Sequence, residues 1–144
     1  MSELTNEEIS AIKQKIGVIS QGFCLAESMT VLENVALPLK VMGVVKNERE
    51  QQAMEILDWL NIGKNSDDYP CELSCGERQC VTIARALIAR PKIILADDPV
   101  CYLDQRTANR VINLLFELSR TDTCVLVTNN NEQRKPALLR EGRE

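Results

Sequence analysis

Three short, continuous runs of apolar residues predict buried β-strands, at residues 16–19, 93–96 and 124–127. Strands that alternate apolar and polar residues are typical of half-exposed sheets, whereas continuous runs are typical of parallel sheets covered on both faces. Segments with helical spacing separate the three runs. Strand–helix–strand alternation predicts an α/β fold with a parallel sheet.

Three capping boxes, each a Ser or Thr followed three residues later by Glu, predict the starts of helices. They are Thr5 with Glu8, Thr30 with Glu33, and Ser74 with Glu77. The first helix is predicted to reach about residue 15, the second residue 42 and the third residue 89. Pro91 follows the third helix, which is where a proline would stop it.

Two further helices are predicted to begin at Asn47 and Asp104, whose side chains can cap a helix N-terminus. Each has apolar residues at intervals of three and four, which place them on one face. These residues are Ala53, Ile56, Leu57 and Leu60 in one helix, and Val111, Leu114, Leu115 and Leu118 in the other. Residues 61–71 are rich in turn-forming residues and predict a loop, and residues 131–144 predict a loose polar tail.

The composition indicates one domain and excludes several functions. The chain has 144 residues, with 17 Lys and Arg against 21 Asp and Glu, a net charge of −4. This mild acidity argues against binding to nucleic acid, and no apolar run is long enough to insert into a membrane. The chain contains no histidine, so catalysis or metal binding by imidazole is excluded.

Six cysteines could suggest disulfides or a metal site. Nothing marks the chain as secreted, and cytosolic thiols stay reduced. The spacing Cys71, Cys75, Cys80 lacks the paired C-x2-C pattern of a zinc site. We expect individual cysteines without shared chemistry, with a redox or metal cluster as the alternative.

The most informative part of the sequence is residues 73–104. It contains LSCGERQ at 73–79, IILADDP at 93–99, and LD at 103–104; SQ at 20–21 precedes it and VTNN at 127–130 follows it. In order and spacing these five segments resemble the ATP-binding-cassette (ABC) ATPases, with their signature motif, Walker B strand, D-loop, Q-loop and switch. The resemblance covers about residues 10–130. It implies a partial P-loop NTPase domain, with a parallel-sheet core and a helical signature subdomain.

The resemblance implies a site for ATP and Mg²⁺. The signature residues would meet the γ-phosphate at a helix N-terminus, where free N–H groups and the helix dipole attract anions. The nucleotide-contacting candidates are Gln21, Ser74, Cys75, Gly76, Glu77 and Asp104. Without the resemblance, Ser74 and Glu77 would indicate only a capped helix.

Two carboxylates follow the second apolar run. Asp97 would hold Mg²⁺, a cation that prefers oxygen ligands, and Gln21 would contact the metal and the attacking water. Asp98 stands where the family has the Glu that polarises this water, and Asn129 stands where it has the switch His. Without the motifs, two acids after a strand would also fit a solvated turn.

Several family features are altered. The chain contains no G-x-x-x-x-G-K-[ST] loop to bind the phosphates. Cys75 replaces a signature Gly and adds a side chain where backbone must approach phosphate. Asp98 shortens the reach of the catalytic carboxylate by about 1 Å, a displacement that can cost about 100-fold in rate. Asn129 has no titrating charge, so little or no activity is expected from the chain alone.

These departures predict an N-terminally incomplete and degenerate domain. We expect about residues 22–90 to form the helical signature subdomain, 91–130 the segment from Walker B to the switch, and 131–144 the tail. Without the phosphate-binding helix, one face of the predicted strands should remain partly uncovered. Self-association or marginal stability is therefore expected.

Two phrases suggest a subgroup. LENVALPL at 32–39 and YPCELS at 69–74 resemble the ATPases of lipoprotein release, macrolide export and cell division (LolD, MacB and FtsE), and favour the lipoprotein-releasing branch. The implied ancestral function is ATP hydrolysis coupled to lipoprotein release or export. The implied partners are a membrane subunit and a second ATPase subunit, at the cytoplasmic side of the inner membrane. The alternatives are a non-catalytic module that pairs with an intact ATPase or permease, and a decayed product without function.

Overall fold

The computed structural model describes residues 3–9, 15–20, 24–128 and 137–138. Its sheet has the order β1–β2–β3–β4, and the first three strands run parallel. They are β1 (Ile16–Ile19), β2 (Ile93–Asp97) and β3 (Cys124–Thr128). The predicted α/β fold with a parallel sheet is confirmed.

The fourth strand lies within the segment predicted as a loose tail. β4 (Ala137–Leu138) pairs antiparallel with β3, opposite Leu126 and Val127. The prediction of a tail without structure therefore fails for these two residues. The rest of residues 131–144 lies outside the described part of the chain.

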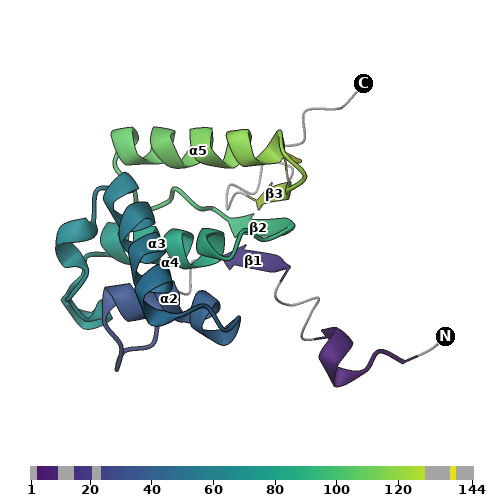
Figure 1. Cartoon of the computed structure of the whole chain (residues 1–144). Helices are drawn as coiled ribbons and strands as arrows, with labels where there is room; N and C mark the ends of the chain where they lie inside the picture. The colour runs from purple at the N-terminus through teal and green to yellow at the C-terminus, as the bar shows by residue number, and fades with distance from the viewer. Residues whose placement is uncertain (1–2, 10–14, 21–23, 129–136, 139–144) are drawn as a thin grey trace.

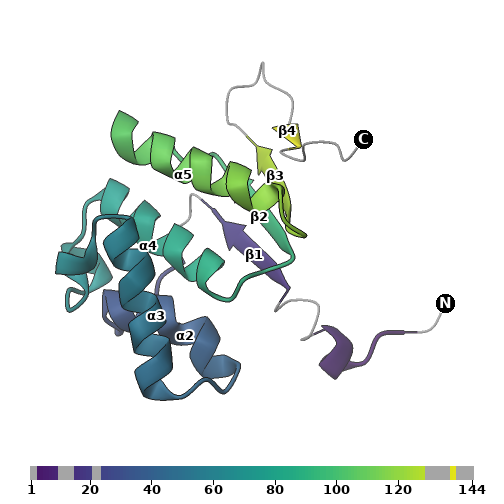
Figure 2. The ribbon, with the colours of Figure 1, turned by 45° about the horizontal axis from the view of Figure 1, so that its top comes forward.

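One face of the sheet is covered by two helices. The register aligns Gly17, Ile94 and Val125 across the three parallel strands, and all three residues are buried. α4 (Cys75–Ile88) packs against β1, and α5 (Gln105–Ser119) packs against β3 (Figures 1 and 2). This face forms the core of the domain.

The opposite face is partly exposed where the structure describes the chain. Val18, Ile93 and Leu95 point to it and are 53%, 39% and 38% exposed. Parallel sheets normally bury both faces. In the apolar run at 93–96, by contrast, only every second side chain is buried. The structure has the uncovered strand face that the sequence analysis expected.

A second layer of helices packs on α4 and forms the helical part of the molecule (Figure 2). It consists of α2 (Val31–Val41) and α3 (Lys46–Trp59), which contact each other and α4. Asn34 is fully buried within this layer. Its side-chain oxygen accepts from Ala26 N at 2.8 Å, and its amide donates to the carbonyls of Met29 and Thr30, so the buried amide group is paired, as burial requires.

Most predicted helix starts are confirmed. The side chains of Thr30, Ser74 and Asp104 accept hydrogen bonds from the first turns of α2, α4 and α5. Thr5 caps the first helix in the same way, and residues 6–9 are helical. Residues 10–14, where that helix was predicted to continue, lie outside the described residues.

Two local predictions are wrong. α3 begins at Lys46 after Val45, and no side chain caps it, whereas Asn47 was the predicted cap. The segment at 61–71 was predicted as a plain loop but contains two 3-10 turns, Gly63–Asn65 and Pro70–Glu72. None of the described helices is both long and apolar enough to cross a membrane.

The two faces of β2 should respond differently to truncation. Ile94→Ala removes a fully buried side chain and should lower the free energy of unfolding by about 2–5 kcal/mol. Leu95→Ala, one residue further, removes a side chain already partly in water and should cost about 1 kcal/mol. Urea unfolding of the two variants measures the difference. Equal losses would contradict an open face at Leu95.

Candidate functional site

The start of α4 is built by reciprocal hydrogen bonds between two residues. Glu77 N donates to Ser74 Oγ at 3.2 Å, and Ser74 N donates to Glu77 Oε1 at 2.9 Å. The backbone bond from Ser74 is the main reason that the pKa of Glu77 is lowered, and the charge of Lys64 contributes. Glu77 is therefore an anion at neutral pH, held in a fixed position at the helix N-terminus.

A hollow of about 520 Å³ opens at this helix start. Five of the predicted nucleotide-contacting residues line it, namely Ser74, Cys75, Gly76, Glu77 and Asp104. The structure therefore brings together the candidates that the described residues include, since Gln21 lies outside them. The sequence reasoning missed Lys64, Tyr102 and Thr107, which line the same hollow. Lys64 was assigned only to a loop, and no sequence signal placed it here.

Gly76 is required by packing. A Cβ at this position would lie 2.8 Å from the carbonyl oxygen of Tyr102, a contact too short to exist. The loop after β2 therefore approaches the backbone of α4 directly. Cys75, by contrast, is exposed in the hollow, so the side chain that replaces the signature glycine does not disturb the core.

Asp104 caps α5 through the same type of geometry. Its carboxylate accepts from Thr107 Oγ1 at 2.6 Å and from Thr107 N at 3.3 Å. These bonds, the hydroxyl bond first, lower the pKa of Asp104. Asp104 therefore has a structural role as the cap of α5, and its contact with a nucleotide stays a prediction.

The last residue of β2, Asp97, and the residue after it, Asp98, form a separate group. Thr128 Oγ1 donates to Asp97 Oδ1 at 3.0 Å, and Asp98 N donates to the carbonyl of Thr128 at 2.7 Å. Asp98 has a φ of 46°, in the left-handed region that few residues other than glycine adopt and that Asp tolerates better than most. The chain therefore turns sharply at the residue that the sequence analysis predicts in place of the catalytic Glu.

One buried hydrogen bond connects α4, whose first turn lines the hollow, with the loop that follows Asp97 and Asp98. Gln79 is fully buried in α4, and its Nε2 donates to the carbonyl of Pro99 at 3.0 Å. Gln79 therefore holds α4 to the loop after Asp97 and Asp98, which we call the acidic turn. The sequence reasoning gave Gln79 no role. The remaining candidates, Gln21 and Asn129, lie outside the described residues.

The turn that carries Asp97 and Asp98 fits Mg²⁺ only if other groups supply the remaining ligands. Among the described residues no group of three Asp, Glu, His or Cys side chains could enclose a metal ion. Mg²⁺ is commonly bound by one or two carboxylates, with phosphate and water as the other ligands. Asp97, at the open end of β2 with one oxygen oriented by Thr128, suits this partial role.

The cysteines behave as individual residues. All six are free thiols. Cys80, which replaces an arginine of the motif, is buried, and burial is the main cause that raises its pKa to about 11. Its thiol is therefore protonated at neutral pH and unreactive.

The chain belongs to the ABC transporter family, whose family model matches residues 1–101. Among the curated relatives, the methionine import ATP-binding protein MetN of Latilactobacillus sakei is 45% identical over 127 residues. MetN 1 of Oceanobacillus iheyensis is 40% identical over 132 residues. These matches cover 87% and 90% of this chain but only 37% and 39% of the relatives, so the chain spans well under half of their length.

Solved structures agree with this assignment. The dimeric post-hydrolysis structure of the ATP-binding cassette MJ0796, bound to ADP and Pi, has a TM-score of 0.75 and 31% identity. It covers 97% of this chain, which in turn covers 70% of that cassette. The chain therefore has the fold of the larger part of an ABC cassette.

The comparisons do not support the lipoprotein-releasing branch. The relatives named above are methionine importers. The phrases that suggested the branch have general structural roles. Asn34 of the first phrase bonds the backbone around the start of α2, and Tyr69 N in the second donates to Glu72 Oε2 at 2.9 Å. Such residues report helix and turn geometry, which gives no information on the substrate.

Acidification tests the charge at the start of α4. The pKa of Glu77 is lowered from an ordinary value of 4.5, so the ionised carboxylate stabilises the folded state above pH 4.5, and this contribution is lost as the pH falls through the lowered pKa. Glu77→Gln should therefore be less stable than wild type at neutral pH, and the difference should shrink as the pH falls through the lowered pKa of Glu77. Urea unfolding at several pH values measures it. A difference that persists at the acidic end would show that packing, not charge, is responsible.

Proposed function

We propose that this chain supplies the signature half of a composite ATP site, closing over a nucleotide held by a second cassette chain. The observation that carries the proposal is the hollow at the start of α4. It combines an exposed helix N-terminus, Ser74, Gly76 and the cation of Lys64, and the carboxylates of Glu77 and Asp104 line it as well. Exposed N–H groups at a helix start and a nearby cation suit a phosphate group.

The phosphate-binding role is assigned to the partner because of what the 144 residues contain. They include no G-x-x-x-x-G-K-[ST] loop, which in P-loop ATPases holds the β- and γ-phosphates. They include the acids Asp97 and Asp98, but Asp98 stands where the family has Glu and Asn129 where it has His. We therefore propose that ATP hydrolysis takes place at the partner's nucleotide, and that the chain has little activity alone.

The proposed assembly is a subunit of an importer. The similar cassette structures are dimeric, which supports a second ATPase chain as partner. The names of the curated relatives support ATP-dependent uptake of methionine or a related small solute. A membrane subunit would dock on the helical layer, which we propose as a signature subdomain over about residues 22–90. This docking would keep the chain at the cytoplasmic side of the membrane.

Mixing with an intact relative tests this function. The purified chain is added to the MetN protein of Latilactobacillus sakei, and the steady-state rate of ATP hydrolysis is measured. We expect a saturable change of rate, about twofold or more, because a second signature surface competes with or replaces the relative's own. Ser74→Ala removes the side chain that caps α4 at the surface proposed to face the nucleotide. This variant should no longer change the rate of ATP hydrolysis.

Thr30→Ala is the matched control. It removes the same kind of helix cap from α2, where Thr30 Oγ1 accepts from Glu33 N at 3.2 Å, and each change should cost about 1 kcal/mol of stability. The Thr30 variant should still change the rate. Equal loss of the effect in both variants, or no effect of the wild-type chain at any concentration, would refute the proposed function.

A further inference from the structure

A groove of about 520 Å³ lies between α3, α4 and α5, and we call it the α3–α5 groove. Its apolar surface comes from Ile56 and Trp59 of α3, Leu87 of α4, and Leu114 and Leu118 of α5. The hollow described above lies at the first turn of α4, whereas this groove lies at the last. The two ends of this 14-residue helix are about 20 Å apart, so both surfaces can be occupied at the same time.

Trp59 is the most exposed of the large apolar side chains in this groove. It is the only tryptophan of the chain and is 43% exposed. Its backbone carbonyl accepts a hydrogen bond from Arg110 Nη1 of α5 at 3.2 Å, which ties the end of α3 to α5. Ile56, one turn earlier on α3, is half-buried. Tryptophan contributes more than most residues to the affinity of a protein interface when a partner covers it.

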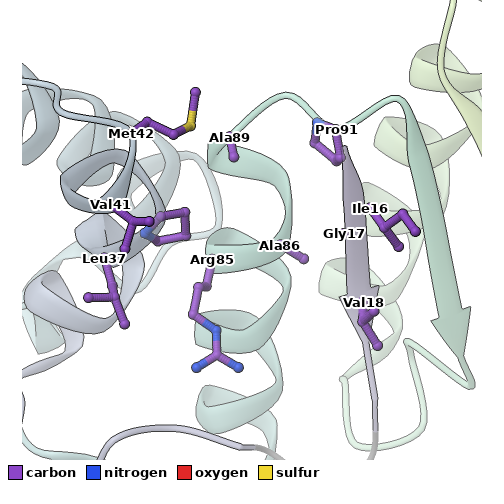
Figure 3. A pocket seen from close by; sticks show the side chains of 11 residues that line it. Ile16, Gly17, Val18, Leu37, Val41, Met42, Arg85, Ala86, Ala89 and Pro91 are labelled. Atoms are coloured by element: carbon purple, nitrogen blue, oxygen red, sulfur yellow. The ribbon is translucent and has the colours of Figure 1, made fainter. Parts of the chain in front are cut away.

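Two residues of opposite charge border the apolar surface. Glu55 is exposed on α3, and Arg90 is exposed in the turn after α4, between Ala89 and Pro91 (Figure 3). Neither Glu55 nor Arg90 forms an ion pair with another described residue. Both charges are therefore available to a partner.

The backbone of Arg90 has an unusual conformation. Its φ is 50°, and its N–H donates to the carbonyl of Leu87 at 3.1 Å. Glycine is the usual residue in this left-handed position after a helix, because it has no Cβ. The turn fixes the backbone from which the guanidinium extends, so less conformational freedom is lost when the side chain binds.

We propose that the α3–α5 groove is an interface with a second copy of this chain, related by a two-fold axis, in which Glu55 of each copy pairs with Arg90 of the other. In a two-fold interface the same surface meets itself, so each contact between two different residues occurs twice. A surface with one carboxylate and one guanidinium beside an apolar floor is complementary to itself. The inference goes beyond the proposed function, which uses the hollow at the other end of α4.

The mixed charge of the rim favours a second copy over other occupants. An apolar ligand would gain nothing from either charge. A partner surface of one sign would attract one of the two residues and repel the other. A second copy supplies both counter-charges and covers Trp59. Because the groove is small beside the roughly 800 Å² that each partner buries in a standard interface, we expect a dissociation constant in the micromolar range.

Charge reversal, followed by rescue on mixing, tests the inference. Sedimentation equilibrium of the full 144-residue chain over about 1–200 µM should show monomer and dimer. The fluorescence emission of Trp59 should move to shorter wavelength as the dimer forms, because the indole leaves water. Arg90→Glu and Glu55→Arg each create two contacts between like charges, so each should raise the dissociation constant about 100-fold.

An equimolar mixture of the two variants should dimerise again, within about 10-fold of the wild-type affinity, because each reversed charge then meets its opposite. This rescue also shows that both variants are folded. Lys92→Glu is the matched control for Arg90→Glu, because Lys92 is an exposed cation two residues further on that lies outside the groove. The Lys92 variant should dimerise like wild type.

Leu95→Lys tests the partly exposed sheet face as the alternative contact, and it should leave the dimer unchanged. Three results would overturn the inference. They are a wild-type chain that stays monomeric at the highest concentration, a mixture of the two charge-reversed variants that stays monomeric, and self-association that is lost in Leu95→Lys but kept in Arg90→Glu.

Discussion

The close packing of α4 on β1 is the constraint on which the rest of the molecule depends. A Cβ on Gly17 would lie 2.7 Å from the carbonyl oxygen of Ala86, so the strand and the helix backbone meet with no side chain between them. From this position α4 contacts α2 and α3 on its other side. The first turn of α4 lines the hollow, and Gln79 donates a hydrogen bond to the loop after β2. One helix therefore fixes the core, the signature surface and the position of the acidic turn.

Local patterns were sufficient to predict much of this arrangement from sequence. The strands are short apolar runs, and the caps of Thr30, Ser74 and Asp104 are bonds between residues three apart, so their chemistry lies within a few residues. The resemblance to ABC ATPases then supplied the roles of the motif residues. The start of α3 was missed because Val45 precedes it without a side-chain bond, and nothing local distinguishes that start from a cap at Asn47.

The contacts that were missed are those between distant segments. Lys64 reaches the hollow because the turns at 61–72 fold back on α4, and Gln79 meets Pro99, which is 20 residues away. Neither contact has a periodicity or a spacing that a sequence shows. The subgroup was also misjudged, because residues such as Asn34 serve the packing of α2 in any member with this fold. Residues at such packing positions do not determine substrate preference.

The two cysteine substitutions within the signature motif are compatible with the fold. Cys75 is exposed and Cys80 fits into the core as a protonated thiol, so the fold accommodates both. The roles predicted for Asp98 and Asn129 concern the reacting atoms, and they stay predictions. Within these 144 residues, the start of α4 that we propose as a signature surface is well formed, no G-x-x-x-x-G-K-[ST] loop is present, and one face of the sheet is partly exposed.

The most direct test of this central claim is an equilibrium titration of the isolated chain with Mg-ATP. Isothermal titration calorimetry should show no saturable binding with a dissociation constant tighter than about 1 mM, since the loop that holds the phosphates is not among the 144 residues. Tighter binding that is lost in Asp97→Asn would contradict the account, because it would mean that this chain holds a nucleotide by itself.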